Sequence, residues 1–270
     1  MTDMLVQSLR RYPVKSMLGE AVPSLTVDAQ GAEGDRRLAL VDLETGRVAT
    51  AKHPRLWRRL LTLSATGAPG RVRIRLADGA DIAADDPAVD ERLSELLGRP
   101  VHLSDERVAG AQVERPAPED VLEHGVTAEV EYATLEISQG TPGTTFVDHS
   151  PLHGITTATL EHIGAEALRY RPNLVLATEP ADRAWLENSW LGRELVIGEV
   201  RLRATLPTPR CSVPTLEHGE LPRAPHAVRV PMRENRVDVP GFGQLPCAGV
   251  YLEVLRPGTI HVGQPAMVVA

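Results

Sequence analysis

Short apolar runs separated by turn residues cover most of the chain, and this pattern predicts many short β-strands. Within residues 72–76, for example, Val72 and Ile74 alternate with Arg73 and Arg75, which is the period of a strand with one buried face. Gly and Pro number 22 each and are spread between the runs, so turns are expected after most of them. The expected strands are residues 5–12, 22–29, 37–43, 59–65, 72–76, 101–103, 174–177, 194–197, 200–206, 249–255 and 259–269.

Helical periodicity is confined to two segments. Asp86 suits the N-cap of a helix that runs to Leu97, and Gly98 suits the position after its end. Residues 156–168 predict a second helix, for which Thr157 is the candidate N-cap. The chain is therefore expected to be mainly β (α+β), with a few helices.

Two further segments lack a regular pattern. Residues 105–128 carry two prolines and many charges, which favours an irregular crossing between domains. Residues 207–240 are rich in Pro, Arg and His and predict a long functional loop. The expected organisation is a first domain at residues 1–104, the crossing at 105–128, and a second domain at 129–270.

Composition narrows the functional classes. The chain has 270 residues, of which 42% are hydrophobic, so a buried core is available. Aromatic residues make up only 3%, which argues against base-stacking surfaces, and the formal net charge of -7 disfavours nonspecific binding to nucleic acid. We expect no nucleic-acid partner, and any basic site has to be local.

The chain shows no pattern of export or membrane insertion. Polar side chains interrupt residues 1–11, and no run approaches the roughly 20 apolar residues that span a bilayer. Two cysteines, Cys211 and Cys247, are too few for a disulfide scaffold. We expect a cytoplasmic protein with no membrane partner.

Cys211 is the first candidate for chemistry. It lies beside Arg210 in a proline-rich loop, and a neighbouring cation favours the thiolate form of cysteine. A soft thiolate suits a soft metal centre. A lone cysteine is more often a small buried hydrophobe, and Cys247, with no adjacent charge, is assigned to that class.

Basic residues at strand ends and turns are the second candidate. Together they can form an anion pocket, because arginine forks match phosphate oxygens and lysine supplies a point charge; singly, each is more often solvated surface. Asn173 can donate its amide to a ligand or hold a turn. His149 and His153 lack partners at metal-ligand spacing. The basic residues are Arg10, Arg11, Lys15, Arg36, Arg37, Arg171 and Arg210.

Taken in their order along the chain, several motifs resemble those of MOSC-domain proteins, named after the C-terminal domain of molybdenum cofactor sulfurase. The motifs are Tyr-Pro-Val-Lys-Ser (12–16), Gly-Asp-Arg-Arg (34–37), Thr-Ala-Lys-His-Pro-Arg-Leu (50–56), Asp-His-Ser-Pro-Leu (148–152), Tyr-Arg-Pro-Asn (170–173), Trp-Leu-Gly-Arg (190–193), Ile-Gly (197–198), Arg-Cys (210–211) and Pro-Gly-Thr-Ile-His-Val-Gly (257–263). The resemblance covers essentially the whole chain. It implies an N-terminal β-barrel-like domain followed by a β-rich MOSC domain, similar in architecture to the mitochondrial amidoxime-reducing components and their bacterial counterparts.

This resemblance also implies a cofactor and a reaction. The cofactor is molybdenum–molybdopterin, with Cys211 as the catalytic residue and metal ligand. The implied activity is an oxidoreductase that reduces small N-hydroxylated or N-oxide substrates. The positions that match cofactor contacts in the family are Lys15, Ser16, Arg36, Ser150, Arg171, Asn173 and Arg210.

Two motifs depart from the family pattern. Asn188 stands where relatives often carry an aspartate, and residues 215–222 replace an Asp-Pro-x-Thr-Gly type of turn, so substrate preference is open to differ. A non-enzymatic cofactor carrier or sulfur-transfer protein, and a binding module that has lost its metal, remain as alternatives. The chain has neither a dinucleotide fingerprint nor the four cysteines of an iron–sulfur cluster, so a separate electron-donor protein is the expected partner.

Overall fold

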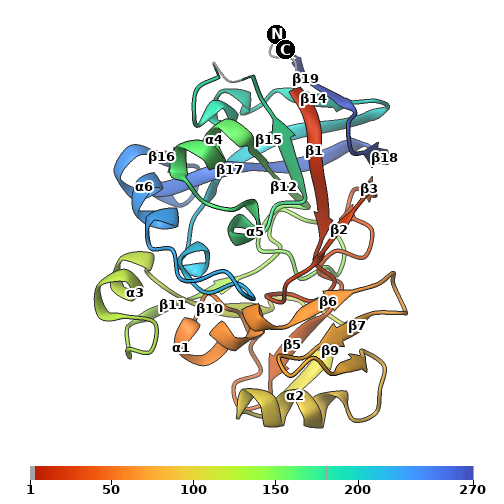
Figure 1. Ribbon diagram of the computed structural model, residues 1–270, viewed down its shortest axis with the longest axis vertical. Coiled ribbons are helices and arrows are strands. Elements are labelled where there is room, and N and C mark those ends of the chain that lie inside the picture. Colours follow the sequence, from red (N-terminus) through yellow and green to blue (C-terminus); the bar gives the residue numbers. More distant parts are fainter. Residues whose placement is uncertain (1–3, 180–181, 270) are drawn as a thin grey trace.

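A closed barrel of seven strands forms the upper part of the molecule in Figure 1. The structure is a computed structural model, and it describes residues 4–179 and 182–269. Strands β12 and β13 are parallel, the other neighbours are antiparallel, and β17 pairs back with β12 to close the ring. The prediction of a mainly β fold with few helices is confirmed. In ring order the strands are β12 (Leu152–Thr156), β13 (Leu174–Ala177), β1 (Met4–Arg11), β19 (Pro265–Val269), β14 (Glu194–Ile197), β15 (Val200–Pro209) and β17 (Gly243–Arg256).

Strand β1 brings the start of the chain into a barrel that is otherwise built from its second half. It pairs with β13 on one side and with β19 on the other, where Met4 lies opposite Ala266. Two short strands, β2 (Glu20–Val22) and β16 (Arg236–Val239), extend the sheet beyond the ring. Alternate side chains point inward and exclude water, which stabilises the closed sheet. The buried barrel core includes Val6, Leu9, Leu174, Leu176, Leu195, Ile197, Leu202 and Leu252.

The N-terminal region forms two smaller sheets around a core of its own, in the lower half of Figure 1, and contributes to a third sheet that packs against the barrel core. β5 pairs with β9, β7 lies between β6 and β8, and β3 lies between β4 and β18, which comes from the end of the chain. This second core contains Leu40, Trp57, Leu60, Ile74 and Leu93. The elements are β3 (Ser24–Asp28), β4 (Gly31–Ala32), β5 (Ala39–Asp42), β6 (Ser64–Thr66), β7 (Arg73–Arg75), β8 (Asp81–Ala83), β9 (Val101–Ser104), α2 (Val89–Leu97) and β18 (Gly258–His261).

Several elements lie where their local patterns predict them. The strands expected at residues 174–177 and 194–197 coincide with β13 and β14. Gly98 ends α2 in a left-handed conformation, as expected. Asp86 is not its N-cap, which is Ala88; instead Asp86 accepts a hydrogen bond from the Ala88 N–H at 2.9 Å in the turn before the helix. Within the residues described, the helices are all too short or too polar to cross a membrane.

Three expectations about irregular or extended segments are wrong. Residues 59–65 begin as a 3-10 helix, η1 (Arg58–Thr62), which follows α1 (Pro54–Trp57). Leu60 and Leu61 are both buried, so this run does not have the one-sided burial of a strand. Pro54, whose fixed φ suits the first turn of a helix, begins the helical segment that η1 continues.

The other two corrections concern segments expected to be irregular. Residues 105–128 contain β10 (Gln112–Pro116), paired with β11 (Tyr132–Glu136), and α3 (Pro118–His124), which has a proline in its first turn. Residues 207–240 contain the end of β15, η3 (Val213–Thr215), α6 (His226–Glu234) and β16. Proline-rich composition conceals these elements, because proline is tolerated at helix starts and at strand edges.

A buried glutamate anchors the helix that follows β12. This helix, α4 (Thr157–Ile163), is capped by Thr156 rather than by Thr157, and Gly164 ends it, so α5 (Ala167–Tyr170) is a separate element. Glu187, in η2 (Leu186–Trp190), accepts hydrogen bonds from the Thr156 N–H at 2.7 Å, the Thr156 hydroxyl at 3.0 Å and the Thr159 hydroxyl at 2.8 Å. Glu187, the residue before Asn188, therefore stabilises the start of α4.

We expect Glu187→Ala to lower the free energy of unfolding by about 3 kcal/mol, because it leaves the buried Thr156 N–H without an acceptor. Urea unfolding measures the change. Glu161→Ala, at an exposed position of α4, is the control and is expected to change stability by less than about 0.5 kcal/mol. Equal losses in both variants would contradict this role for Glu187.

Candidate functional site

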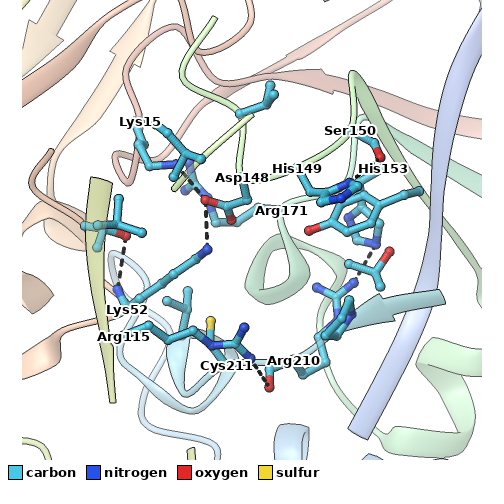
Figure 2. Close-up of a pocket in the computed structure, with 18 of the residues that line it drawn as sticks. Lys15, Lys52, Arg115, Asp148, His149, Ser150, His153, Arg171, Arg210 and Cys211 are labelled. Carbon is cyan, nitrogen blue, oxygen red and sulfur yellow. Dashed lines mark hydrogen bonds and ion pairs between the residues drawn. The ribbon is translucent and has the colours of Figure 1, made fainter. Parts of the chain in front are cut away.

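One pocket gathers side chains from both halves of the chain (Figure 2). Each of the positions expected to bind a cofactor or a metal lines it, although they come from loops far apart in the sequence. The loops lie after β1, after β4, before β12, between α5 and β13, and after β15. The residues are Lys15, Ser16, Arg36, Ser150, Arg171, Asn173, Arg210 and Cys211.

Three of these residues have unusual backbone conformations. Ser16, Arg36 and Arg171 have φ values of 66°, 46° and 54°, in the left-handed region that residues with a side chain rarely occupy. In the part of the chain that the structure describes, only two other non-glycine residues have positive φ, Ser138 and Trp185. Local strain of this kind persists where the surrounding structure enforces it, often at functional sites.

Tyr12 holds two of the arginines together. Its ring is fully buried, and the guanidinium carbons of Arg36 and Arg171 lie 4.7 Å and 4.4 Å from the ring centroid. The Tyr12 hydroxyl donates to the carbonyl of Pro172 at 3.1 Å, and its backbone N–H donates to Asp35 at 2.7 Å. The aromatic face offsets part of the repulsion between the two cations. Sequence analysis missed this role for Tyr12, although it begins the Tyr-Pro-Val-Lys-Ser motif.

The two arginines on Tyr12 differ in how well they are neutralised. Arg36 pairs with Asp35, and although burial lowers the pKa of Arg36, this carboxylate leaves it above its ordinary value. Burial, followed by the charge of Arg36, lowers the pKa of Arg171 to about 10. Arg171 donates to the Met17 carbonyl at 2.7 Å, but its Nη2 has no hydrogen-bond partner among the described residues. A buried cation with an unused donor favours the binding of an anion.

Lys15 and Lys52, which also line the pocket, share one carboxylate (Figure 2). Their Nζ atoms lie 2.6 Å and 2.9 Å from Oδ1 of Asp148. Burial lowers the pKa of Lys15 to about 8, despite the opposing effect of Asp148. Burial alone would raise the pKa of Asp148, but the two lysines hold it well below its ordinary value. Two cations against one anion leave this group with excess positive charge.

Arg210 and Asn173 contribute mainly through contacts within the protein. Arg210 lies 2.7 Å from Nε2 of His153 and packs against Tyr170, while its Nε is buried without a partner among the described residues. Burial and then Arg210 lower the pKa of His153 well below its ordinary value, so His153 is neutral. The Asn173 amide donates to the Arg10 carbonyl at 3.3 Å, and its side-chain oxygen accepts from the His153 N–H at 3.2 Å. Both bonds reach residues far from Asn173 in the sequence, so this side chain connects β1 to β12 and does not hold a local turn.

Close backbone packing supports this corner of the pocket. Gly249, in β17, has a φ of +79°, and a Cβ there would lie 2.5 Å from His153 Nε2 and 2.5 Å from the Gly154 carbonyl oxygen. Only glycine fits both the conformation and the space. The position of His153, and through it that of Arg210, therefore depends on Gly249.

The two cysteines have different surroundings. Cys211 is half-buried in the short loop between β15 and η3, and its sulfur points into the pocket (Figure 2). Cys247 is fully buried in β17, and burial raises the pKa of its thiol to about 12. Cys247 is therefore the small buried residue that the sequence predicts, whereas Cys211 is accessible to a ligand.

Other basic residues from the sequence analysis have partners elsewhere. Arg10 donates to the carbonyl of Gly19, Arg11 pairs with Glu20, and Arg37 contacts Gln30. Several residues that sequence reasoning left without a role do line the pocket: Lys52, Arg115, Asp148, His149, His153 and Arg169. Lys52 and Asp148 lie within motifs that matched the family, while Arg115 lies in the segment that was expected to be irregular.

The metal-ligating side chains of the pocket limit the kind of metal group that it can bind. Across residues 4–179 and 182–269, no group of three or more His, Cys, Asp or Glu side chains could hold a metal ion. A metal bound by Cys211 would need further ligands from a group that brings its own chelating atoms. Such a group would also need anionic oxygens to satisfy Arg171 and the lysines. The residues present fit a metal carried by an anionic organic chelator.

Comparison with known proteins gives one curated relative and several solved structures. Mitochondrial amidoxime-reducing component 1 of Mus musculus is 28% identical over 130 residues, which cover 44% of this chain and 37% of that protein. The matched segment thus spans well under half of the relative's length. The YUAD protein from Bacillus subtilis is 10% identical and covers 98% of this chain and 95% of its own, with a TM-score of 0.45. YiiM from Geobacillus stearothermophilus is 19% identical and covers 51% of this chain and 67% of its own, with a TM-score of 0.31.

Two family descriptions match the chain in succession. The MOSC N-terminal beta barrel domain matches residues 3–106, and the MOSC domain matches residues 141–266. The eight predicted site residues come from both matched regions, since Lys15, Ser16 and Arg36 lie in the first and Ser150, Arg171, Asn173, Arg210 and Cys211 in the second. The chain belongs to the MOSC family, in the arrangement that joins a MOSC N-terminal β-barrel domain to a MOSC domain.

Proposed function

We propose that this chain binds the molybdenum–molybdopterin cofactor in the pocket and ligates the metal through Cys211. The observation that carries the proposal is a half-buried thiol in the same pocket as buried cations whose donors are not all used by the residues that the structure describes. Membership of the MOSC family and the match to an amidoxime-reducing component support it. A basic pocket without a thiol would fit any phosphate ligand, so the sulfur is the discriminating feature.

Different residues of the chain bind the metal and the phosphate part of the cofactor, and others support the loops that carry them. The Cys211 thiolate holds the metal, while Arg171, Arg36 and Lys15 bind the phosphate part of the pterin through charge-assisted hydrogen bonds. Arg210 and Asn173 hold neighbouring backbone in place, and Ser16 accepts a hydrogen bond from the Ala51 N–H at 3.1 Å, which fixes the loop after Lys15. When bound, the molybdenum supplies two-electron redox chemistry.

We further propose that the protein is a reductase of small N-hydroxylated or N-oxide compounds and takes electrons from a separate donor protein. The match to an amidoxime-reducing component motivates the reaction, and the presence of only two cysteines in the sequence motivates the external donor. A non-enzymatic cofactor carrier is the second candidate, because a binding pocket alone also serves that function.

Metal analysis and turnover separate these candidates. Protein made in a host that synthesises the cofactor is expected to contain about one molybdenum per chain and to reduce an amidoxime with a reduced dye as donor. NADH or NADPH alone is expected to support no turnover. Protein without molybdenum would refute cofactor binding, whereas molybdenum without turnover from any donor would favour the carrier.

Anion affinity is expected to fall as the pH rises through 8. Lys15 binds an anion in its protonated form, and its pKa of about 8 means that this form is lost above pH 8. Sulfate, whose charge is constant in this range, should bind cofactor-free protein about tenfold more weakly at pH 9 than at pH 7. Calorimetric titration measures this. In Lys15→Arg the fall should disappear, and a fall of the same size there would contradict the role of Lys15.

A further inference from the structure

The pocket has an aromatic side as well as a cationic one. The rings of His149 and Tyr251 stack with centroids 5.6 Å apart and an interplanar angle of 23°. Phe242 meets His149 edge-on at 5.9 Å. All three side chains line the same pocket as Cys211, and we call them the aromatic wall. A chain with only 3% Phe, Trp and Tyr thus places two of these residues in contact with His149 at its site.

Phe242 is presented to solvent instead of being packed into a core. It is 45% exposed and sits in the turn between β16 and β17, with Gly241 and Gly243 on either side. Both glycines have positive φ, and both have open space where a Cβ would stand, so the turn is shaped to project the ring between them. The only other phenylalanine, Phe146, is buried to 1% exposure. An exposed phenylalanine that lines a pocket is a candidate contact for an apolar ligand.

The His149 ring is held in place from two other directions. Its Nδ1 lies 3.0 Å from the hydroxyl of Ser150. A Cβ at Gly140 would lie 2.7 Å from Cε1 of this ring, so the ring packs directly against the glycine backbone. Burial lowers the pKa of His149, which favours the neutral ring that stacks well on apolar surfaces. The wall is therefore held in place at His149 and open at Phe242.

The wall is connected to the Cys211 side of the pocket by direct contacts. Tyr251 meets the ring of His153 edge-on at 6.2 Å, and His153 contacts Arg210, the residue before Cys211. A small ligand on the wall would thus lie in the pocket that holds the thiol. The cationic residues of the pocket are suited to an anion and not to an uncharged ring.

We propose that the aromatic wall binds the planar organic part of the substrate, so that aryl N-hydroxylated compounds are preferred over alkyl ones. The proposal rests on the reductase function proposed above and names its substrate class. Offset or edge-on contacts with Phe242 and His149 would hold an aryl ring, while a methyl group in its place would lose most of that contact.

The test combines equilibrium binding with turnover. Benzamide and acetamide are neutral, unreactive probes that differ only in the ring, and calorimetry is used to measure their binding to protein from the cofactor-competent host. Benzamide is expected to bind at least about tenfold more tightly than acetamide, and Phe242→Ala should weaken benzamide about three- to tenfold while leaving acetamide unchanged. Leu255→Ala, at a residue of β17 that is 38% exposed, is the matched control and should change neither.

With turnover as the second readout, Phe242→Ala should raise the KM for benzamidoxime by a similar factor and leave kcat and the KM for acetamidoxime unchanged. Equal binding of the two amides, or benzamide binding that Phe242→Ala does not alter, would overturn the aromatic wall. Phe242-dependent benzamide binding in a protein that turns over no amidoxime would support the wall and refute the reductase function.

Discussion

Cys211→Ser is expected to abolish molybdenum-dependent turnover while the protein remains folded. A serine hydroxyl is a harder ligand than a thiol and is far less acidic, so it does not replace the thiolate at a soft metal. Removal of a residue that only hydrogen-bonds to a metal-ligating side chain already lowers metal affinity or activity about 10- to 100-fold. Removal of the ligand itself should therefore lower activity by more than about 100-fold. Because Cys211 is half-buried and Cys211→Ser is nearly isosteric, the circular dichroism spectrum should not change.

Cys247→Ser is the matched control for this variant. Cys247 is fully buried in β17, so the exchange is expected to cost some stability but to leave molybdenum content per folded chain unchanged. Molybdenum is measured by elemental analysis, and turnover with a reduced dye. Full activity with stoichiometric molybdenum in Cys211→Ser would rule out Cys211 as the ligand, and loss of molybdenum in Cys247→Ser alone would assign the role to the other cysteine.

Arg171→Gln should give the second-largest effect, a loss of about 10- to 100-fold in cofactor affinity. Arg171 is buried, its pKa is lowered to about 10 by burial and by Arg36, and its Nη2 is left unpaired by the described residues. A charge-assisted hydrogen bond from this group to a phosphate oxygen is worth about 1.5–3 kcal/mol, and glutamine replaces it with a weaker neutral bond. Molybdenum content after dialysis against cofactor-free buffer measures the loss.

Stability separates a binding role of Arg171 from a structural one. The cofactor-free variant should unfold at an equal or higher temperature, because it no longer buries a poorly neutralised charge beside Arg36. Arg75→Gln, at an exposed arginine paired with Asp81, is the control and should retain the cofactor. A lowered melting temperature with unchanged molybdenum content would show that Arg171 only supports the fold.

Local sequence patterns predicted the elements that are determined by residues close together in the sequence. Alternation identified β7, turn glycines and prolines marked the ends of many strands, and Gly98 marked the end of α2, whose N-cap is Ala88 and not Asp86. The same reasoning failed at residues 105–128 and 207–240, where proline was taken to indicate irregular chain. Proline at a helix start or at the end of a strand has the same local composition as proline in a loop, so the pattern does not separate the two cases.

The sequence by itself thus determined the mainly β class, the family resemblance, and the identity of the residues that were expected to form a site. It also separated Cys211 from Cys247 by their neighbours along the chain. These properties depend on residue type and on short-range order, and a single chain carries them without reference to its fold.

Only the tertiary structure decided which of those residues meet and in what state of charge. It placed β1 in a barrel with strands from the second half of the chain, set Arg36 and Arg171 against the ring of Tyr12, and gave Lys15 and Lys52 one shared carboxylate. The physical reason is that strand pairing and burial depend on contacts between distant segments. Burial in turn shifts pKa values and leaves donors unpaired, and the spacing of residues along a chain encodes neither.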